Sequence, residues 1–149
     1  MVRTTKVKIE VEDNALKIKE LITEAVSAFL YEAGGELLAR IIRNSRTDTG
    51  LTKGSYEYRV VEKPEESMAE VHVGSALENA IWEEYGTGEY ALNGDGRKGK
   101  WRYKDPKGNW HTTSGKKPNK PVARAYRALR KPLEERLGEI IKEKIGGGR

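Results

Sequence analysis

The sequence predicts a protein of the α+β class, with an antiparallel β-sheet packed against a long N-terminal helix and a C-terminal helix. Three observations carry this prediction. Apolar residues recur at helical spacing near both ends of the chain, alternating segments between them indicate a β-hairpin, and the polar segment 89–120 contains a second hairpin signal. The chain of 149 residues is therefore expected to form a single domain over 1–149, with a protruding basic hairpin arm at about 89–120.

The N-terminal part is predicted to begin as a strand and continue as a helix. Residues 5–11 alternate between apolar and polar side chains, which is typical of a half-buried strand, and an Asp-Asn pair at 13–14 offers a helix N-cap. From residue 15 to about residue 43, apolar side chains fall at steps of three and four, which predicts a helix. The glycine pair at 34–35 predicts a kink, a break or close packing against another element.

The middle of the chain is predicted to form a hairpin followed by a short helix. Residues 44–53 form a loop, residues 55–62 and 69–73 alternate as two strands, and a polar turn at 63–67 joins them. Residues 78–85 then fit a short helix, which the Gly-Thr-Gly sequence after it would end.

The segment 89–120 is long, polar and rich in glycine. It contains a small predicted hairpin, with strands at 101–103 and 109–111 and a turn at 105–108. Its two tryptophans argue against disorder, because a solvated linker has no use for them. The last helix is predicted to begin at Pro121. Pro132 should kink or split it, and the glycines after residue 145 should stop it.

The positive charge is concentrated in one segment. Residues 97–131 contain 13 Lys and Arg and one acid, a net charge of +12, while the rest of the chain has 15 basic and 22 acidic residues, a net charge of −7. An acidic body with one basic segment can contact nucleic acid, or equally the acidic face of a neighbouring subunit.

Several function classes are excluded or disfavoured. The chain has no cysteine and two distant histidines, which leaves little for a metal centre, and no apolar run is long enough to span a membrane. The triplet at 48–50 is that of the aspartic proteases, but its polar flanks would not bury a pair of carboxylates. Glu83 and Glu84 are adjacent and diverge on a helix, and His72 and His111 lie on predicted strands without a nearby Ser or Asp. We expect no enzyme, no cofactor and no metal.

The basic segment also carries aromatic residues among its cations. Such interleaving suits stacking on single-stranded bases together with phosphate contacts, and it equally suits an aromatic anchor in a subunit groove. Candidates for facing a subunit or DNA are Arg97, Lys98, Lys100, Trp101, Arg102, Tyr103, Lys104, Trp110, Lys116 and Lys117.

Three ordered stretches form a recognisable set. The first reads Asp-Thr-Gly from residue 48, the second has Val-Gly-Ser from residue 73 and Glu-Glu-Tyr-Gly-Thr-Gly from residue 83, and the third places Lys-Pro and a further proline before the last helix. In this order and spacing they resemble the bacteriophage head–tail joining family, also called neck or tail-completion proteins, over nearly the whole chain. The motif positions are Asp48, Thr49, Gly50, Ser55, Gly74, Glu84, Tyr85, Gly86 and Thr87.

The resemblance implies a non-enzymatic structural protein of a phage or prophage. Such a subunit would assemble as a ring at the head–tail junction and contact connector and tail proteins. The ring would surround the path of the genomic DNA, and its contacts with that DNA would be non-specific. It would be a monomer when free, located in the virion neck or tail and made in the bacterial cytoplasm, with no membrane contact. The alternative is a nucleic-acid-binding module that uses the basic, tryptophan-bearing segment 97–131.

Overall fold

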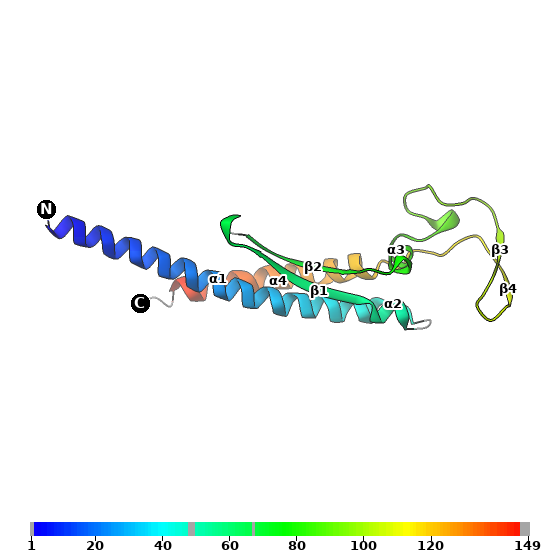
Figure 1. The fold of residues 1–149 in the computed structure, drawn as a ribbon, viewed down its shortest axis with the longest axis horizontal. Coiled ribbons are helices and arrows are strands. Elements are labelled where there is room, and N and C mark those ends of the chain that lie inside the picture. The colour runs from blue at the N-terminus through cyan, green and yellow to red at the C-terminus, as the bar shows by residue number, and fades with distance from the viewer. Residues whose placement is uncertain (1, 48–49, 67, 147–149) are drawn as a thin grey trace. The chain divides into compact units, whose positions relative to one another are not determined.

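The computed structural model describes residues 2–47, 50–66 and 68–146, with side chains from residue 17 onward. The fold is α+β, as predicted, with a long N-terminal helix, a C-terminal helix and two small antiparallel sheets (Figure 1). One sheet pairs β1 (Tyr56–Lys63) with β2 (Met68–Ser75). The other pairs β3 (Trp101–Lys104) with β4 (Trp110–Thr113).

Helix α1 spans Val2–Asn44, so the predicted strand over residues 5–11 and the N-cap at 13–14 are wrong. The alternation there covers only seven residues and has no partner strand. The helix predicted from residue 15 is already nucleated, and extending it adds a hydrogen bond for each further residue without a new nucleation step. Lysine and glutamate, which occupy the polar positions of the alternating segment, are also good helix formers.

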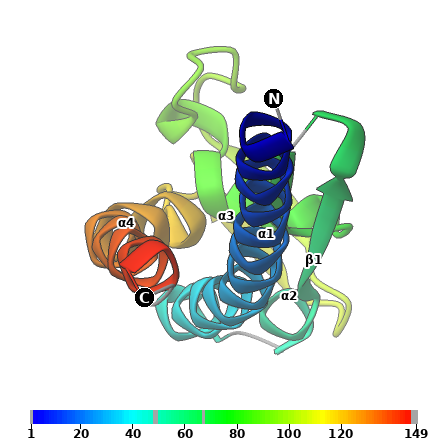
Figure 2. The same ribbon diagram turned by 90° about the vertical axis from the view of Figure 1, so that its left-hand side faces the viewer.

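Neither the glycine pair at 34–35 nor Pro132 interrupts its helix. Figure 2 shows α1 as one continuous coil, and α4 runs unbroken over Pro121–Gly146. Gly34 is buried within α1, which fits the close-packing alternative. A proline at 132 removes the hydrogen bond to the carbonyl of Ala128. Ala128 is exposed, so water can satisfy that carbonyl and the helix continues.

The predictions for the middle of the chain are confirmed with one addition. The first hairpin turns through a 3₁₀ segment, Pro64–Glu66, and α3 spans Glu78–Tyr85. The addition is α2, a single helical turn over Leu51–Gly54, where the sequence predicted only a loop. The second hairpin and the start of α4 at Pro121 lie where they were predicted.

The chain divides into two compact units. Unit 1 comprises Met1–Gly35, Arg59–His72 and Arg130–Arg149, and unit 2 comprises Glu36–Tyr58 and Val73–Leu129. In unit 1, Phe29 and Ala33 of α1 are buried, and the Arg136 guanidinium lies 5.5 Å from the centre of the Phe29 ring.

Unit 2 has its own small core, which contains residues from helices and strands alike. Its members are Ile41, Tyr56, Ala80 and Ala125, with Leu38, Val73 and Val122 packed against them. Among the described helices, none carries an apolar stretch that would cross a bilayer.

Candidate functional site

Helix α3 turns a carboxylate inward and three large apolar side chains outward. Glu83 is only 4% exposed, whereas Ile81, Trp82 and Tyr85 are 56%, 44% and 49% exposed. Tyr85 lies three positions after Trp82 and four after Ile81, so it neighbours both side chains on the helix surface. This reverses the usual arrangement, in which charged residues face water and apolar residues face the core. We call Ile81, Trp82 and Tyr85 the α3 face.

Glu84 explains part of this reversal, because its carboxylate caps the N-terminus of α4. The two oxygens accept hydrogen bonds from the backbone N–H groups of Val122 and Ala123, each at 2.9 Å. The first N–H groups of a helix have no partner inside the helix, and negative charge is favoured there. Pro121, at the first helical position, has no N–H to satisfy. A motif residue of α3 therefore fixes the start of a helix that lies 37 positions further along the chain.

Glu83 holds the segment that precedes α4. Its carboxylate forms an ion pair with Lys116, and its backbone carbonyl accepts hydrogen bonds from the N–H groups of Asn119 (2.8 Å) and Lys120 (3.3 Å). Lys120 has a positive φ of 54°, which is uncommon for a residue other than glycine. Burial, and then the negative charges of Glu84 and Glu83, raise the pKa of the Tyr56 hydroxyl, so this side chain stays neutral beside them.

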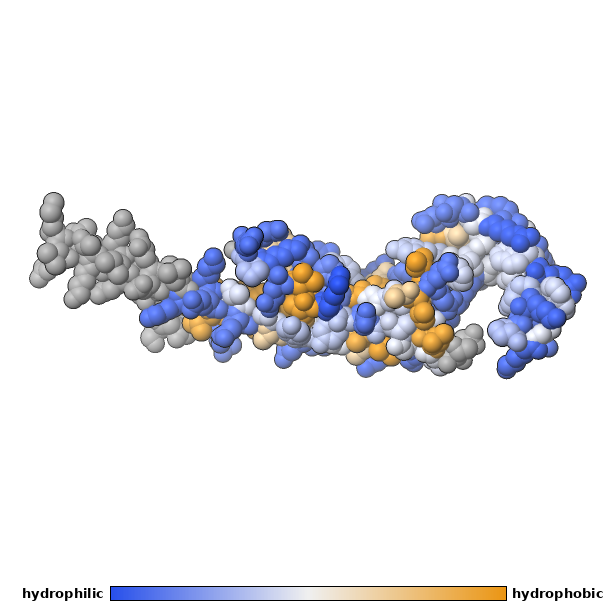
Figure 3. Space-filling view, in the orientation of Figure 1, coloured by the Kyte–Doolittle hydropathy of each residue, from blue (hydrophilic) through white to orange (hydrophobic). Residues whose placement is uncertain are grey.

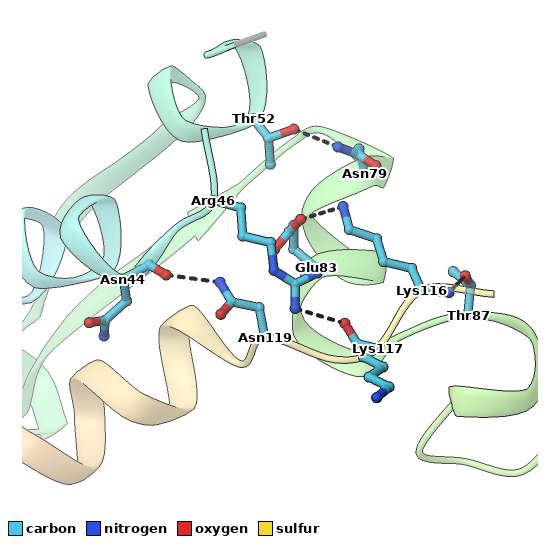
Figure 4. Close-up of polar contacts among 9 residues, drawn as sticks. All are labelled: Asn44, Arg46, Thr52, Asn79, Glu83, Thr87, Lys116, Lys117 and Asn119. Carbon is cyan, nitrogen blue, oxygen red and sulfur yellow. Dashed lines mark hydrogen bonds and ion pairs between the residues drawn. The ribbon is translucent and has the colours of Figure 1, made fainter. Parts of the chain in front are cut away.

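Asn119 connects the same segment to the end of α1. Its side-chain amide donates to the carbonyl of Asn44 at 2.8 Å (Figure 4). The Asn44 amide donates to the carbonyl of Pro121 at 3.2 Å. The Arg46 guanidinium donates to the Lys117 carbonyl at 3.1 Å. These bonds satisfy groups at a helix terminus that would otherwise depend on water. Segments more than 70 residues apart in sequence are thereby joined.

The motif residues near α2 form a second set of contacts. The Ser55 and Ser75 hydroxyls lie 2.6 Å apart. The Asn79 amide donates to the Thr52 hydroxyl at 2.7 Å (Figure 4). Gly50 precedes α2 with a φ of 80°, and Gly74 lies on β2. Asp48 and Thr49 lie outside the described residues.

The remaining motif residues form the exit from α3. The Thr87 N–H donates to the Lys116 carbonyl, and the Lys116 N–H donates to the Thr87 hydroxyl, both at 2.9 Å. Gly86 and Gly88 have positive φ values of 75° and 61°. A side chain at Gly88 would collide with the Ser114 carbonyl and with the ring of Trp101. We call the whole set the polar joint: Asn44, Arg46, Thr52, Ser55, Ser75, Asn79, Glu83, Glu84, Thr87, Lys116, Lys117 and Asn119.

The second hairpin has two chemically different faces, which its register defines. Lys104 pairs with Trp110 and Arg102 with Thr112, and residues that are directly paired share a face. The Arg102 guanidinium and the Lys104 ammonium lie 5.1 Å and 6.0 Å from the centre of the Trp110 ring. Trp110 nevertheless remains 59% exposed. We call Arg102, Lys104, Trp110 and Thr112 the cationic face.

The opposite face of this hairpin packs inward at one end. Trp101 is half-buried against Gly88, and the Arg97 guanidinium lies 5.2 Å from its ring centre. Tyr103 and His111 are a cross-strand pair whose rings stack with centroids 5.2 Å apart.

The turn of the hairpin is organised by one carboxylate. Asp105 accepts hydrogen bonds from the Asn109 N–H at 2.8 Å and from the Asn109 side chain at 3.2 Å, and its carboxylate lies 2.8 Å from the His111 ring nitrogen Nε2. The hydrogen bond with His111, and then that from the Asn109 backbone, lower the pKa of Asp105 to about 2. The expectation that His111 has no nearby acid is wrong, because the turn brings Asp105 back to it.

The basic candidates separate into two groups. Lys116 is bound to Glu83, and the Lys117 ammonium lies 5.5 Å from the Tyr90 ring centre, so both contribute to unit 2 itself. The cations of residues 97–107 are exposed: Arg97, Lys98, Lys100, Arg102, Lys104 and Lys107.

Several residues of the polar joint could not be expected from the sequence. Asn44, Arg46 and Asn119 are ordinary surface residue types, and only the fold brings them together. One feature of the sequence could have indicated that Trp82 is exposed: it is followed directly by two acidic residues on a short predicted helix. Within the described parts of the chain, no three potential metal ligands gather. Comparisons with protein-family models, curated proteins and solved structures found no match.

Proposed function

We propose that this chain is a non-enzymatic structural subunit of a phage or prophage particle. It assembles as a ring at the head–tail junction, where it completes the tail or connects it to the head. Its partners are further copies of itself, connector proteins and tail proteins, and its place in the mature particle is the neck or tail. The sequence resemblance to the head–tail joining family motivates the proposal, and the α3 face supports it.

The exposed α3 face is the observation that carries an assembly role. Aromatic and large aliphatic side chains are enriched at the centres of protein interfaces, where they supply most of the binding energy. Here they stand outward on a helix whose inner side is occupied by Ala80 of the core and by two carboxylates of the polar joint. Figure 3 shows apolar surface in the region of unit 2 where Figure 1 labels α3. Such a surface fits a protein partner better than water.

The polar joint supports the same proposal because it makes unit 2 rigid. The three stretches that carry the family resemblance lie far apart in sequence, yet the Ser55 hydroxyl contacts that of Ser75, and the Glu84 carboxylate caps the helix that begins at Pro121. A head-to-tail ring requires two different surfaces held in a fixed relation within each subunit. A network that joins the ends of α1, α3 and α4 provides such rigidity in unit 2.

Sedimentation velocity over a range of concentrations tests the proposal, with the chain alone and with the connector and tail proteins encoded beside it. We expect self-association or binding to one of these proteins. Ile81→Glu should weaken that association by tenfold or more, on the order of the loss of one buried apolar anchor. Ile145→Glu is a matched control, because Ile145 is also 56% exposed but lies at the end of α4.

Two results would count against this function. One is a chain that stays monomeric at every concentration and joins neither the connector nor the tail protein. The other concerns the surface alone: equal weakening by Ile81→Glu and Ile145→Glu would show that the α3 face is not the contact.

A further inference from the structure

The exposed aromatic residue of the β3–β4 hairpin has cationic neighbours, whereas the aromatic residues of the α3 face have an apolar one. Trp110 stands on one side of a two-stranded ribbon with Arg102 and Lys104 beside it, and both cations lie within 6.0 Å of its ring centre. We propose that this cationic face binds single-stranded nucleic acid. Trp110 stacks on a base, and Arg102 and Lys104 contact the flanking phosphates. The inference goes beyond the assembly function and does not depend on it.

The register of the hairpin places these groups correctly for a polymer with alternating bases and phosphates. Arg102 and Lys104 are two residues apart on one strand, so both point to the same side at a separation of roughly 7 Å. Trp110 lies directly opposite Lys104 on the partner strand. Aromatic rings that bear successive bases, next to cations that follow the backbone, are the usual elements of single-strand recognition.

The acids of the hairpin do not neutralise this face. The carboxylate of Asp105 is engaged within the turn by Asn109 and His111. Of the carboxylates in the described parts of the chain, none forms an ion pair with the six exposed cations of segment 97–107. Unpaired cations beside an exposed ring keep their full attraction for an anionic ligand.

The composition of the face favours nucleic acid over an acidic protein partner. Lysine is depleted at the centres of protein interfaces but is a common phosphate ligand. Segment 97–107 contains four lysines, and the hairpin has no aliphatic side chain next to Trp110. In Figure 3 the region of the β3–β4 hairpin is almost entirely hydrophilic on the face shown. A single strand is favoured over a duplex because only an unpaired base can stack on a protruding indole.

Fluorescence anisotropy with the full chain and a labelled oligothymidine of about 15 nucleotides tests the proposal. We expect binding at about 50 mM salt and a steep loss of affinity as salt rises, because each neutralised phosphate contributes a slope of about −0.7. Trp110→Ala should weaken binding roughly 5- to 150-fold through the lost stacking, and Trp110→Phe should recover part of it. Tyr31→Ala, an exposed aromatic change in unit 1, should leave the affinity unchanged.

A second pair of variants tests the phosphate contacts separately. Arg102→Gln with Lys104→Gln should reduce the magnitude of the salt slope by about 1.4. Lys142→Gln with Lys144→Gln removes the same charge from exposed positions of α4 and should leave the slope unchanged. Circular dichroism of each variant checks that the fold is retained.

Four outcomes would overturn the proposal. Absence of binding at about 50 mM salt removes it. Equal affinities of the parent chain and Trp110→Ala remove the stacking contact. Tighter binding to a duplex of the same length would show that the ligand is double-stranded DNA and not a single strand. Equal binding to polyglutamate of matched charge would show that the partner is an acidic protein and not a nucleic acid.

Discussion

Two parts of unit 2 expose aromatic residues, and they do so for different physical reasons. On α3, Trp82 and Tyr85 face outward because the other sides of the helix are used by Ala80, which enters the core, and by the carboxylates of Glu83 and Glu84. On the β3–β4 hairpin, Trp110 is exposed because a two-stranded ribbon has no core to cover it. The first set has apolar neighbours and the second has cationic ones.

An exposed aromatic residue indicates a kind of partner only together with the residues around it. Ile81 beside Trp82 makes a surface that gains by excluding water, as protein interfaces do. Arg102 and Lys104 beside Trp110 make a surface that attracts anions and remains hydrated. We therefore propose assembly for the α3 face and nucleic-acid contact for the cationic face.

We expect the greatest loss of stability from a substitution at Gly88, the glycine where α3 and the β3–β4 hairpin meet. Gly88→Ala places a Cβ against the Ser114 carbonyl and the Trp101 ring at a positive φ. We expect a loss of about 3 kcal/mol in the free energy of unfolding, from backbone strain and overpacking together. Gly94→Ala is the matched control, because its φ is 73° but nothing lies within 4 Å, and it should cost only about 1 kcal/mol. Urea unfolding measures both, and equal losses would show that the contact with Trp101 is unimportant.

A smaller effect tests whether the inner side of α3 is structural. Glu84→Ala removes both acceptors from the N-terminus of α4 and should lower the free energy of unfolding by about 2 kcal/mol. Glu78→Ala, at an exposed position of the same helix, should change it by less than about 0.5 kcal/mol. Thermal or urea unfolding compares the two variants. If they behave alike, the cap is not a principal contact of the joint.

The smallest effect concerns the turn of the hairpin and its dependence on pH. The pKa of Asp105 is lowered from 3.8 to about 2, so its contribution to the folded turn is complete above the ordinary value. The contribution is lost as the pH falls through about 2, because the protonated carboxyl is a poorer acceptor for Asn109 and His111. Amide chemical shifts of Asn109 should follow this titration, while those of α3 should not. Asp105→Asn should abolish the transition, and an unchanged titration in that variant would assign it to another group.

The sequence predicts much of this fold because the relevant patterns are local. Helical spacing from residue 15, alternation in both strands of the first hairpin, and Pro121 before the last helix each depend on neighbouring residues alone. The same reasoning fails at residues 5–11, where alternation suggested a strand. A helix that has already formed extends through such a pattern when no partner strand is present.

Less of the candidate site than of the fold could be predicted from local sequence patterns. The basic and aromatic character of the hairpin was visible in composition, and so was its turn. The carboxylates of α3 gave no sign of their partners, since Glu83 binds Lys116 and Glu84 binds the backbone of α4. No spacing rule connects a side chain to a helix that starts 37 residues later.

Propensity, periodicity and charge belong to the chain, so the sequence indicated both hairpins, most of the helices and the place of the positive charge, although it missed α2 and the start of α1. Which side of each element is used depends on the fold. The fold brings Glu83 and Glu84 to their partners and leaves Trp82 outward, and it pairs Lys116 with Glu83 while Arg102 and Lys104 lie beside Trp110. The physical reason is that burial and pairing depend on long-range contacts, since a charge is buried only where the fold supplies its partner.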